Sequence, residues 1–309
     1  LSADSSDGFN PMQTTIGRPV SVTGPGTFFG KAQRTLTFDA SPYPGWWLER
    51  TDLPESLPIP VAVHNVWNAT RNIVLHCGSP HNYLRMVEHI VALKVGMGLD
   101  DVVIRTDSGD PPLFDRSSMD LVEAVESAGI VVSRPKPATY VTVREPVTTA
   151  GPNGSFLTFL PAEGGAKSLL VDCAVDFPSA IGKQRIVFPV TAKHFRHAAL
   201  ARTNATRGMM LYCQTVGKIF ADIRNLGYTN RNILIAGRRR YHNPPEPGLD
   251  HQGKSLEAVW HRSCLDLLAA VALISRVRLA GRIISYKSGH VLDVRMVAML
   301  YKHNLLVKI

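Results

Sequence analysis

The order helix, glycine break, strand occurs twice in this chain, once in each half. Over 86–104, apolar residues recur at helical spacing, glycines end the helix, and a β-branched run predicts a strand. The stretch 264–284 repeats this order, with Gly281 in front of its strand. A duplicated unit of one sheet and two helices explains the repeat. Packing two such units together places their long helices side by side in a shared core.

We therefore expect an α+β protein in which two similar sheet-plus-two-helices domains sandwich their helices. The first domain is expected to span 13–134 and the second 138–309, because Pro135-Lys136-Pro137 excludes regular structure between them. The opening stretch 1–12 lacks apolar periodicity and is predicted to be a flexible arm. A length of 309 residues is sufficient for two mid-sized domains.

Hydrophobic periodicity and Gly/Pro punctuation predict the individual elements. The predicted strands are 19–22, 34–38, 61–63, 73–76, 101–104, 156–160, 168–177, 185–189, 232–235 and 282–286, with a turn at 23–26. The predicted helices are 84–93, 117–128, 215–226, 256–274 and 292–302.

Composition excludes several classes of protein. A hydrophobic fraction of 45% with 19% charged residues argues against a disordered chain. No apolar run approaches the roughly 18–20 residues that span a bilayer. The four cysteines lie far apart without a C-x-x-C, so neither a disulfide framework nor a zinc ribbon is expected. The net charge of +9 mildly favours an acidic partner, but Arg238-Arg239-Arg240 is too short to indicate nucleic-acid binding.

Short motifs along the chain occur in the order found in a known enzyme family. They are Gln13-Thr14-Thr15-Ile16, Thr23-Gly24-Pro25-Gly26, Gly30-Lys31, Arg50-Thr51-Asp52-Leu53, Val87-Glu88-His89, Ala201-Arg202-Thr203 and Tyr286-Lys287-Ser288-Gly289-His290. With these motifs the chain resembles the UDP-3-O-acyl-N-acetylglucosamine deacetylases (LpxC), the zinc amidohydrolases of lipid A synthesis. The resemblance covers nearly the whole chain and implies the family's fold of two α+β domains that sandwich their helices.

The resemblance also implies roles for particular residues. In the family, zinc is held by the His of V-E-H and by a His and an Asp spaced H-x-x-x-D on the second long helix, where positions i and i+4 share one face. The matching positions here are His89 and Asp266 for zinc. Glu88 matches the general base, His290 matches the His that stabilises or protonates the tetrahedral intermediate, and Thr203 matches a substrate-binding position.

Two departures from the family pattern concern the zinc site directly. The register of Leu265-Asp266 places Arg262 where the second zinc His belongs, and Ala270 where the family has the Asp that orients the catalytic His. His261 is a possible substitute ligand, but five residues of α-helix separate it from Asp266 by about 140°, so it can serve only if the helix is locally distorted or the register is shifted. A guanidinium at the ligand position repels a dication and could instead pair with Asp266. Other substituted positions are Phe28 in place of a His, Ser263 in place of a Lys, and Arg116 in place of a Gly.

These departures lead to three hypotheses. The first is a catalytically silent LpxC-like protein without a cofactor, retained as a structural or interaction subunit with protein partners. The second is an active zinc-dependent deacetylase in which His261 replaces the missing ligand. The third is a non-catalytic binder of acyl or nucleotide-sugar ligands. The charge balance at Arg262 leads us to expect the first.

The start of the chain suggests a location. The chain begins at Leu1 rather than at a methionine and carries an arm ahead of the first motif. Since the family also occurs in mitochondria of some eukaryotes and the chain is basic, we expect a mitochondrial matrix protein or a subunit of a matrix-facing complex. A cytoplasmic location is the alternative.

Overall fold

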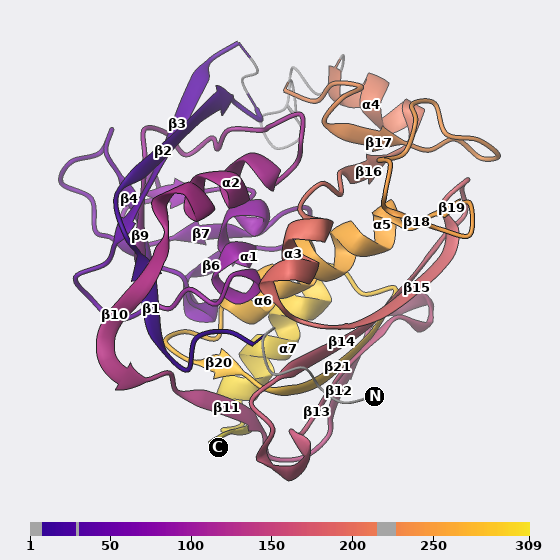
Figure 1. The fold of residues 1–309 in the computed structure, drawn as a ribbon. Helices are drawn as coiled ribbons and strands as arrows, with labels where there is room; N and C mark the ends of the chain where they lie inside the picture. The colour runs from indigo at the N-terminus through magenta and orange to yellow at the C-terminus, as the bar shows by residue number, and fades with distance from the viewer. Residues whose placement is uncertain (1–7, 29–30, 215–226) are drawn as a thin grey trace.

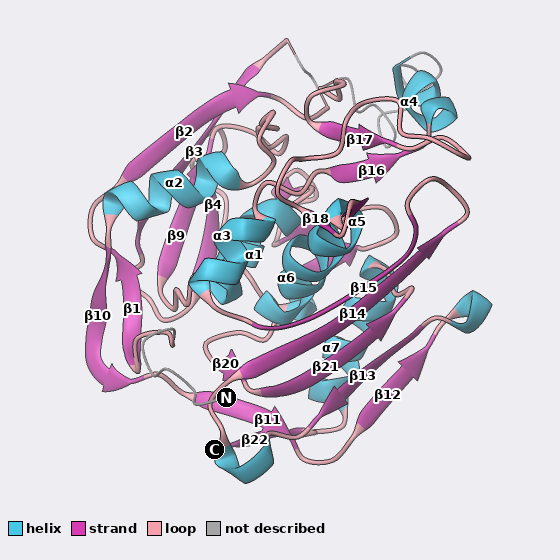
Figure 2. Cartoon of the chain, turned by 45° about the vertical axis from the view of Figure 1, so that its right-hand side comes forward, coloured by secondary structure: helices cyan, strands magenta, loops and turns pink. Residues whose placement is uncertain are grey.

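The duplication predicted from the sequence is present in the two main sheets (Figures 1 and 2). A computed structural model describes residues 8–28, 31–214 and 227–309. Its first five-stranded sheet has the order β2 (Val20–Pro25), β3 (Gln33–Ala40), β9 (Val102–Thr106), β4 (Trp46–Arg50) and β5 (Ile59–Pro60). The second has the order β12 (Val147–Ala150), β13 (Phe156–Leu160), β21 (Gly281–Tyr286), β14 (Leu169–Phe177) and β15 (Gly182–Pro189).

The two sheets share one pattern of strand directions. In the first sheet β4 pairs parallel with β9 and the other neighbours pair antiparallel. In the second sheet β14 pairs parallel with β21, again with antiparallel neighbours on either side. The α+β fold of two similar units is therefore confirmed. The division at 134 and 138 stays a prediction.

Helices of both halves lie between the two sheets, whereas α4 (Arg207–Gln214) lies apart from them at the upper right (Figure 2). Those of the first half are α1 (Glu88–Gly96) and α2 (Met119–Ala128). Those of the second half are α3 (Ala192–Ala198), α4 (Arg207–Gln214), α5 (Glu257–Trp260), a π-helix (His261–Leu267), α6 (Leu268–Ala272) and α7 (His290–Lys302). Helix α1 packs against α6 and the π-helix, and a single buried apolar cluster includes residues of both sheets and these helices. The shared core is thus observed.

Smaller sheets complete the described fold. They are β1 (Met12–Ile16) with β10 (Ile130–Pro137); β6 (Val66–Asn68), β7 (Val74–His76) and β8 (Tyr83–Leu84); β11 (Tyr140–Val143) with β20 (Arg278–Leu279) and β22 (Leu306–Lys308); β16 (Thr203–Ala205) with β17 (Ile233–Ile235); and β18 (Asp250–His251) with β19 (Lys254–Ser255). No helix in the described part of the chain is long and apolar enough to cross a membrane.

Five predicted elements differ from the structure. The helix predicted at 84–93 begins only at Glu88, because Leu84 belongs to β8. Residues 135–137 are not irregular, because they end β10, an edge strand where proline is tolerated. The stretch 23–26 is not a turn, because β2 continues to Pro25. The strand expected at 61–63 ends at Pro60. The predicted helix 256–274 contains the π-helix, and the helix predicted at 215–226 lies outside the described residues.

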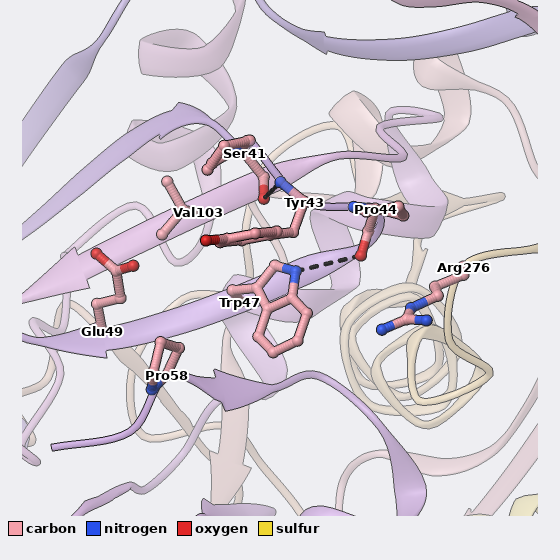
Figure 3. Close-up of a pocket in the computed structure, with 9 residues that line it drawn as sticks. Ser41, Tyr43, Pro44, Trp47, Glu49, Pro58, Val103 and Arg276 are labelled. Atoms are coloured by element: carbon pink, nitrogen blue, oxygen red, sulfur yellow. Dashed lines mark hydrogen bonds between the residues drawn. The ribbon is translucent and has the colours of Figure 1, made fainter.

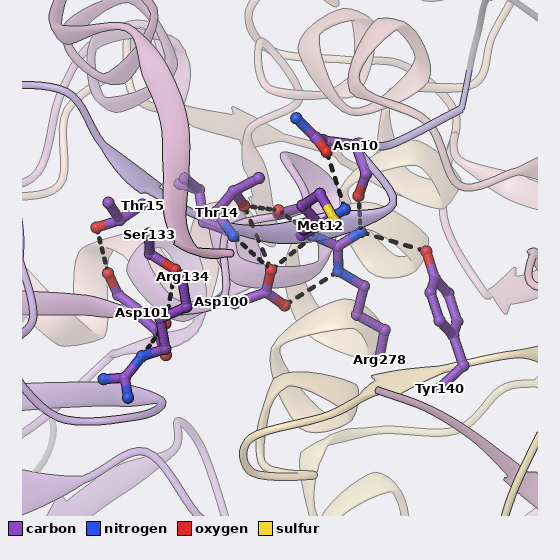
Figure 4. Close-up of polar contacts among 12 residues, drawn as sticks. Asn10, Met12, Thr14, Thr15, Asp100, Asp101, Ser133, Arg134, Tyr140 and Arg278 are labelled. Carbon is purple, nitrogen blue, oxygen red and sulfur yellow. Dashed lines mark hydrogen bonds and ion pairs between the residues drawn. The ribbon is translucent and has the colours of Figure 1, made fainter. Parts of the chain in front are cut away.

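A polar network joins the first half of the chain to the second (Figure 4). Arg278 of β20 donates from Nε to Asp100 Oδ1 at 3.0 Å and from Nη2 to Asp100 Oδ2 at 2.6 Å. The same Arg278 donates to the carbonyl oxygen of Asn10 at 2.7 Å. Residues 1–7 of the predicted arm lie outside the described residues, whereas Asn10 is held against the second half of the chain.

A buried lysine connects the central helices. Lys94 of α1 donates from Nζ to the carbonyl oxygens of Ala272 and Ile274, both at 2.7 Å, at the end of α6. Only 6% of Lys94 is exposed, and this burial lowers the pKa of its ammonium group to about 7. The contact therefore ties the two duplicated halves together at a group whose charge changes near neutral pH.

Replacing Lys94 by methionine tests this contact. Lys94→Met leaves two buried carbonyls without their donor, which costs about 1–3 kcal/mol for each unsatisfied group. Between about pH 7 and pH 10 the unfolded chain keeps a lysine proton that the folded protein has released, so the Lys94 contribution to the unfolding free energy rises with pH. Denaturant unfolding at pH 7 and pH 9 should show the wild type gaining stability relative to Lys94→Met. The exposed Lys193→Met is the control, and identical pH dependence in all three proteins would contradict the prediction.

Candidate active site

Three elements bring chemically active side chains together in the middle of the fold. Helix α1 begins with Glu88 and His89, the π-helix carries His261 and Asp266, and α7 begins with His290. Nε2 of His89 lies 3.1 Å from Nε2 of His261. Nε2 of His290 lies 3.5 Å from Glu88 Oε1 and 3.8 Å from Asp266 Oδ1. The structure thus gathers five of the residues that the sequence singled out.

The π-helix explains how His261 reaches this cluster. An α-helix would turn His261 about 140° away from Asp266, but hydrogen bonds from i to i+5 bring residues five apart onto one face. Nδ1 of His261 accordingly lies 3.5 Å from Asp266 Oδ2. The expectation that these two side chains diverge was wrong, because it assumed regular α-helical geometry across 261–267.

Arg262 makes its shortest contacts with Ser288 and Asp293. Its Nε donates to the carbonyl oxygen of Ser288 at 2.9 Å, and its Nη2 donates to Ser288 Oγ at 2.7 Å. The same Nη2 lies 2.5 Å from Asp293 Oδ2, whereas Nη1 is 3.9 Å from Asp266 Oδ2. The predicted pair with Asp266 exists, but Asp293 is the closer partner. Ala270, the other substituted position, is buried in α6.

Burial and neighbouring charges set the protonation of the cluster. Burial, reinforced by His261, lowers the pKa of His89 to about 3, so His89 is a neutral imidazole near pH 7. Burial opposes ionisation of Asp266, but His261, His290 and Arg262 together hold the pKa of Asp266 below its ordinary value. The cluster therefore presents a neutral imidazole at His89 beside an ionised carboxylate at Asp266.

Glu88 has the environment of a proton acceptor. Burial raises the pKa of Glu88, although the nearby His290 acts in the opposite direction. Its Oε1 accepts a hydrogen bond from the backbone N–H of Ile73, which fixes the carboxylate. Its Oε2 is buried and has no hydrogen-bond partner among the described residues. One carboxylate oxygen is thus held by the backbone while the other remains available for a proton.

The donor set suits zinc, with one ligand out of place. Neutral histidine nitrogens and a carboxylate are ordinary zinc ligands, and two nitrogens about 2.05 Å from zinc at tetrahedral angles lie about 3.3 Å apart. The facing Nε2 atoms of His89 and His261, at 3.1 Å, nearly match this separation. Within the described residues, however, no three His, Cys, Asp or Glu side chains are already disposed to hold a metal ion. The carboxylate of Asp266 lies against Nδ1 of His261 and would have to rotate toward the two Nε2 atoms to complete a three-ligand zinc site.

The remaining predicted positions lie in varied surroundings. Thr203 is partly buried at the start of β16, where its backbone pairs with Ile233. Phe28 is buried, and the guanidinium carbon of Arg85 lies 4.6 Å from the centre of its ring. Arg116 is on the surface and pairs with Glu123 at 2.6 Å. The role of Thr203 toward a substrate stays a prediction.

The sequence analysis missed two buried ion pairs near these motifs. Arg202, beside Thr203, donates from Nε to Glu257 Oε1 at 2.7 Å. Arg262 pairs with Asp293, three residues after His290. The sequence held a signal for this second pair. Asp293 lies three residues after His290, and the register already lacked a carboxylate at Ala270.

A pocket of about 380 Å³ lies elsewhere in the fold (Figure 3). Its lining includes Tyr43, Trp47 and Arg276, with the Tyr43 and Trp47 rings edge to face and their centres 6.2 Å apart. Nε1 of Trp47 donates to the carbonyl oxygen of Pro44 at 3.2 Å. The pocket shares no residue with the histidine cluster, so we do not assign the candidate chemistry to it.

Comparison with known proteins places this geometry in context. The model of the LpxC family, UDP-3-O-acyl N-acetylglycosamine deacetylase, matches residues 13–302. A UDP-3-O-acyl-N-acetylglucosamine deacetylase of Solibacter usitatus is 26% identical over 290 residues, or 93% of this chain and 90% of the relative. Proteins of the same name from Trichormus variabilis and Cellvibrio japonicus are 28% and 27% identical over 289 and 288 residues. These alignments cover 92% and 93% of this chain, and 96% and 89% of the relatives.

Metal analysis tests the donor set. We expect the purified wild type to hold stoichiometric zinc and His261→Ala to lose most of it, because His261 supplies one of the two facing nitrogens. Elemental analysis by mass spectrometry measures this directly. His251→Ala, at an exposed position on β18, is the matched control and should retain the metal. Full zinc occupancy in His261→Ala would remove His261 from the site.

Proposed function

Because the chain belongs to the UDP-3-O-acyl N-acetylglycosamine deacetylase family, we propose that it is an active zinc-dependent deacetylase. Its proposed substrate is a UDP-3-O-acyl-N-acetylglucosamine, whose N-acetyl amide it hydrolyses. The observation that carries this proposal is the approach of His261 to His89, with Nε2 atoms 3.1 Å apart. The proposed third ligand Asp266, the proposed base Glu88 and a third histidine, His290, lie in the same cluster.

The hypothesis of a silent subunit loses its main support. It depended on a guanidinium in the place of the second zinc ligand, but Arg262 makes its shortest contacts with Ser288 and Asp293. The three relatives described above are each named as deacetylases. Nothing in the comparisons indicates catalytic silence or protein partners, and none of them supports the mitochondrial location that the start of the chain suggested.

The proposed reaction uses the buried carboxylate as a base. A bound zinc ion would supply Lewis acidity to the acetyl carbonyl, with His89, His261 and Asp266 as its ligands. Glu88 accepts a proton from the attacking water as the water oxygen bonds to the carbonyl carbon. The C–N bond then breaks, the proton passes to the departing amine nitrogen, and acetate and the free glucosamine amine are released.

The proposed role of His290 is to act on the same carbonyl group. Its Nε2 lies within 4 Å of both Glu88 and Asp266 and so faces the region between the base and the proposed ligands. From there it can donate a hydrogen bond to the negative charge that develops on the carbonyl oxygen, or a proton to the leaving nitrogen. Thr203 remains the proposed substrate-binding residue.

The Glu88→Gln variant tests the proposed base. An amide cannot accept the proton, so kcat should fall on the order of 10²–10⁴-fold while the zinc content stays unchanged. Release of acetate from UDP-3-O-acyl-N-acetylglucosamine measures the activity, and the exposed Glu55→Gln serves as the control. Wild-type protein that holds zinc but releases no acetate would contradict the proposed function. If the substrate nevertheless raised the melting temperature of that protein, the hypothesis of a non-catalytic binder would replace that of an active deacetylase.

A further inference from the structure

His290 has one nitrogen directed toward the site and another without a partner. Nε2 faces Glu88 and Asp266, as described above. Nδ1 is buried and accepts or donates no hydrogen bond within the described residues. A histidine that acts through one nitrogen is ordinarily oriented by a hydrogen bond at the other. The resemblance leads us to expect this hydrogen-bond partner at position 270. The methyl group of Ala270 cannot form a hydrogen bond.

Asp293 supplies a carboxylate in the same neighbourhood. It lies three residues after His290 on α7, a spacing that places two side chains on adjacent positions of one helix face. Its side chain is fully buried, and Oδ2 is taken by Arg262 at 2.5 Å. In the part of the chain that is described, its Oδ1 is buried and has no hydrogen-bond partner. One imidazole nitrogen and one carboxylate oxygen, both buried and both unpaired, thus stand a single turn apart.

Arg262 gives Asp293 a fixed position and opposes its protonation. Arg262 is itself anchored by two hydrogen bonds to Ser288, one to the carbonyl oxygen and one to Oγ. Burial raises the pKa of Asp293, while the charges of Arg262 and His290 act in the opposite direction. The guanidinium therefore favours the charged carboxylate, which accepts hydrogen bonds only, and leaves Oδ1 as its unused acceptor.

We propose that Asp293, held in place by Arg262, is the positioning residue of His290 and accepts a hydrogen bond from its Nδ1–H. This bond keeps the proton on Nδ1 and directs Nε2 toward the reacting carbonyl, in place of the carboxylate that Ala270 lacks. The two atoms lie more than 4 Å apart in the structure, so this bond forms only when substrate binds, as catalytic hydrogen bonds often do. The inference rests on the proposed function for its effect on turnover, but the tautomer of His290 can be measured without turnover.

Kinetics of Asp293→Asn test the effect on catalysis. We expect kcat to fall 10–100-fold with a smaller change in KM and an unchanged zinc content, since the amide is a weaker acceptor and leaves Arg262 uncompensated. Asp172→Asn is the matched control, because Asp172 is also a buried carboxylate paired with arginines, Arg185 and Arg282, in the second sheet. The control should keep its kcat. Equal losses in the two variants would reduce Asp293 to a structural role.

A second variant and a spectroscopic measurement separate positioning from folding. Adding Ala270→Asp to Asp293→Asn should restore most of the lost kcat by returning a carboxylate to the second long helix. Nitrogen-15 NMR of the imidazoles, assigned with His290→Gln, should show a protonated Nδ1 at His290 in the wild type and a shifted signal in Asp293→Asn. Should the double variant fail to fold, the NMR comparison alone decides. A His290 signal that is identical in wild type and Asp293→Asn overturns this inference, whereas an inactive wild type with the expected shift overturns only the proposed function.

Discussion

His89 and His261 approach each other because the helix that carries His261 has π-helical rather than α-helical geometry over 261–267. The two imidazoles come from the two duplicated halves, one from the start of α1 and one from the π-helix that continues into α6. With five residues from His261 to Asp266, only i to i+5 geometry keeps both side chains on the face toward α1. The shared core of α1 and α6 then holds that face against His89. The chemistry of the cluster follows from this local change in helical geometry.

The same local change decides where the positive charge of Arg262 lies. As the residue after His261, Arg262 points toward Ser288 and Asp293, and its charge is balanced there by a buried carboxylate. The guanidinium pairs most closely with Asp293 and so fixes a carboxylate near His290, while its Nη1 lies 3.9 Å from Asp266. In the proposed account, Arg262 and Asp293 form one unit with His290, and a carboxylate on α7 takes the place of the one missing at Ala270.

Hydrophobic periodicity was sufficient to predict the duplicated α+β architecture and several elements of both main sheets, including the strand at 156–160, and the final helix. It did not predict β4, β12 or α3. Local patterns failed where tertiary pairing overrides them. The prolines of 135–137 lie in a strand because β10 is an edge strand, and β2 continues through the predicted turn at 23–26. The motifs named the residues of the candidate site, but the sequence did not predict how these residues are arranged. No sequence pattern distinguishes a π-turn from an α-helix at His261, so the 140° separation followed from an assumption of regular geometry.

Anomalous scattering measured at the zinc edge, from crystals of the wild-type protein grown with zinc, tests this account most directly. The account predicts a single strong peak within bonding distance of Nε2 of His89 and Nε2 of His261, with the Asp266 carboxylate turned toward it and Arg262 still paired with Asp293. A map without a peak between those two nitrogens, or with the guanidinium of Arg262 in that place, would contradict it.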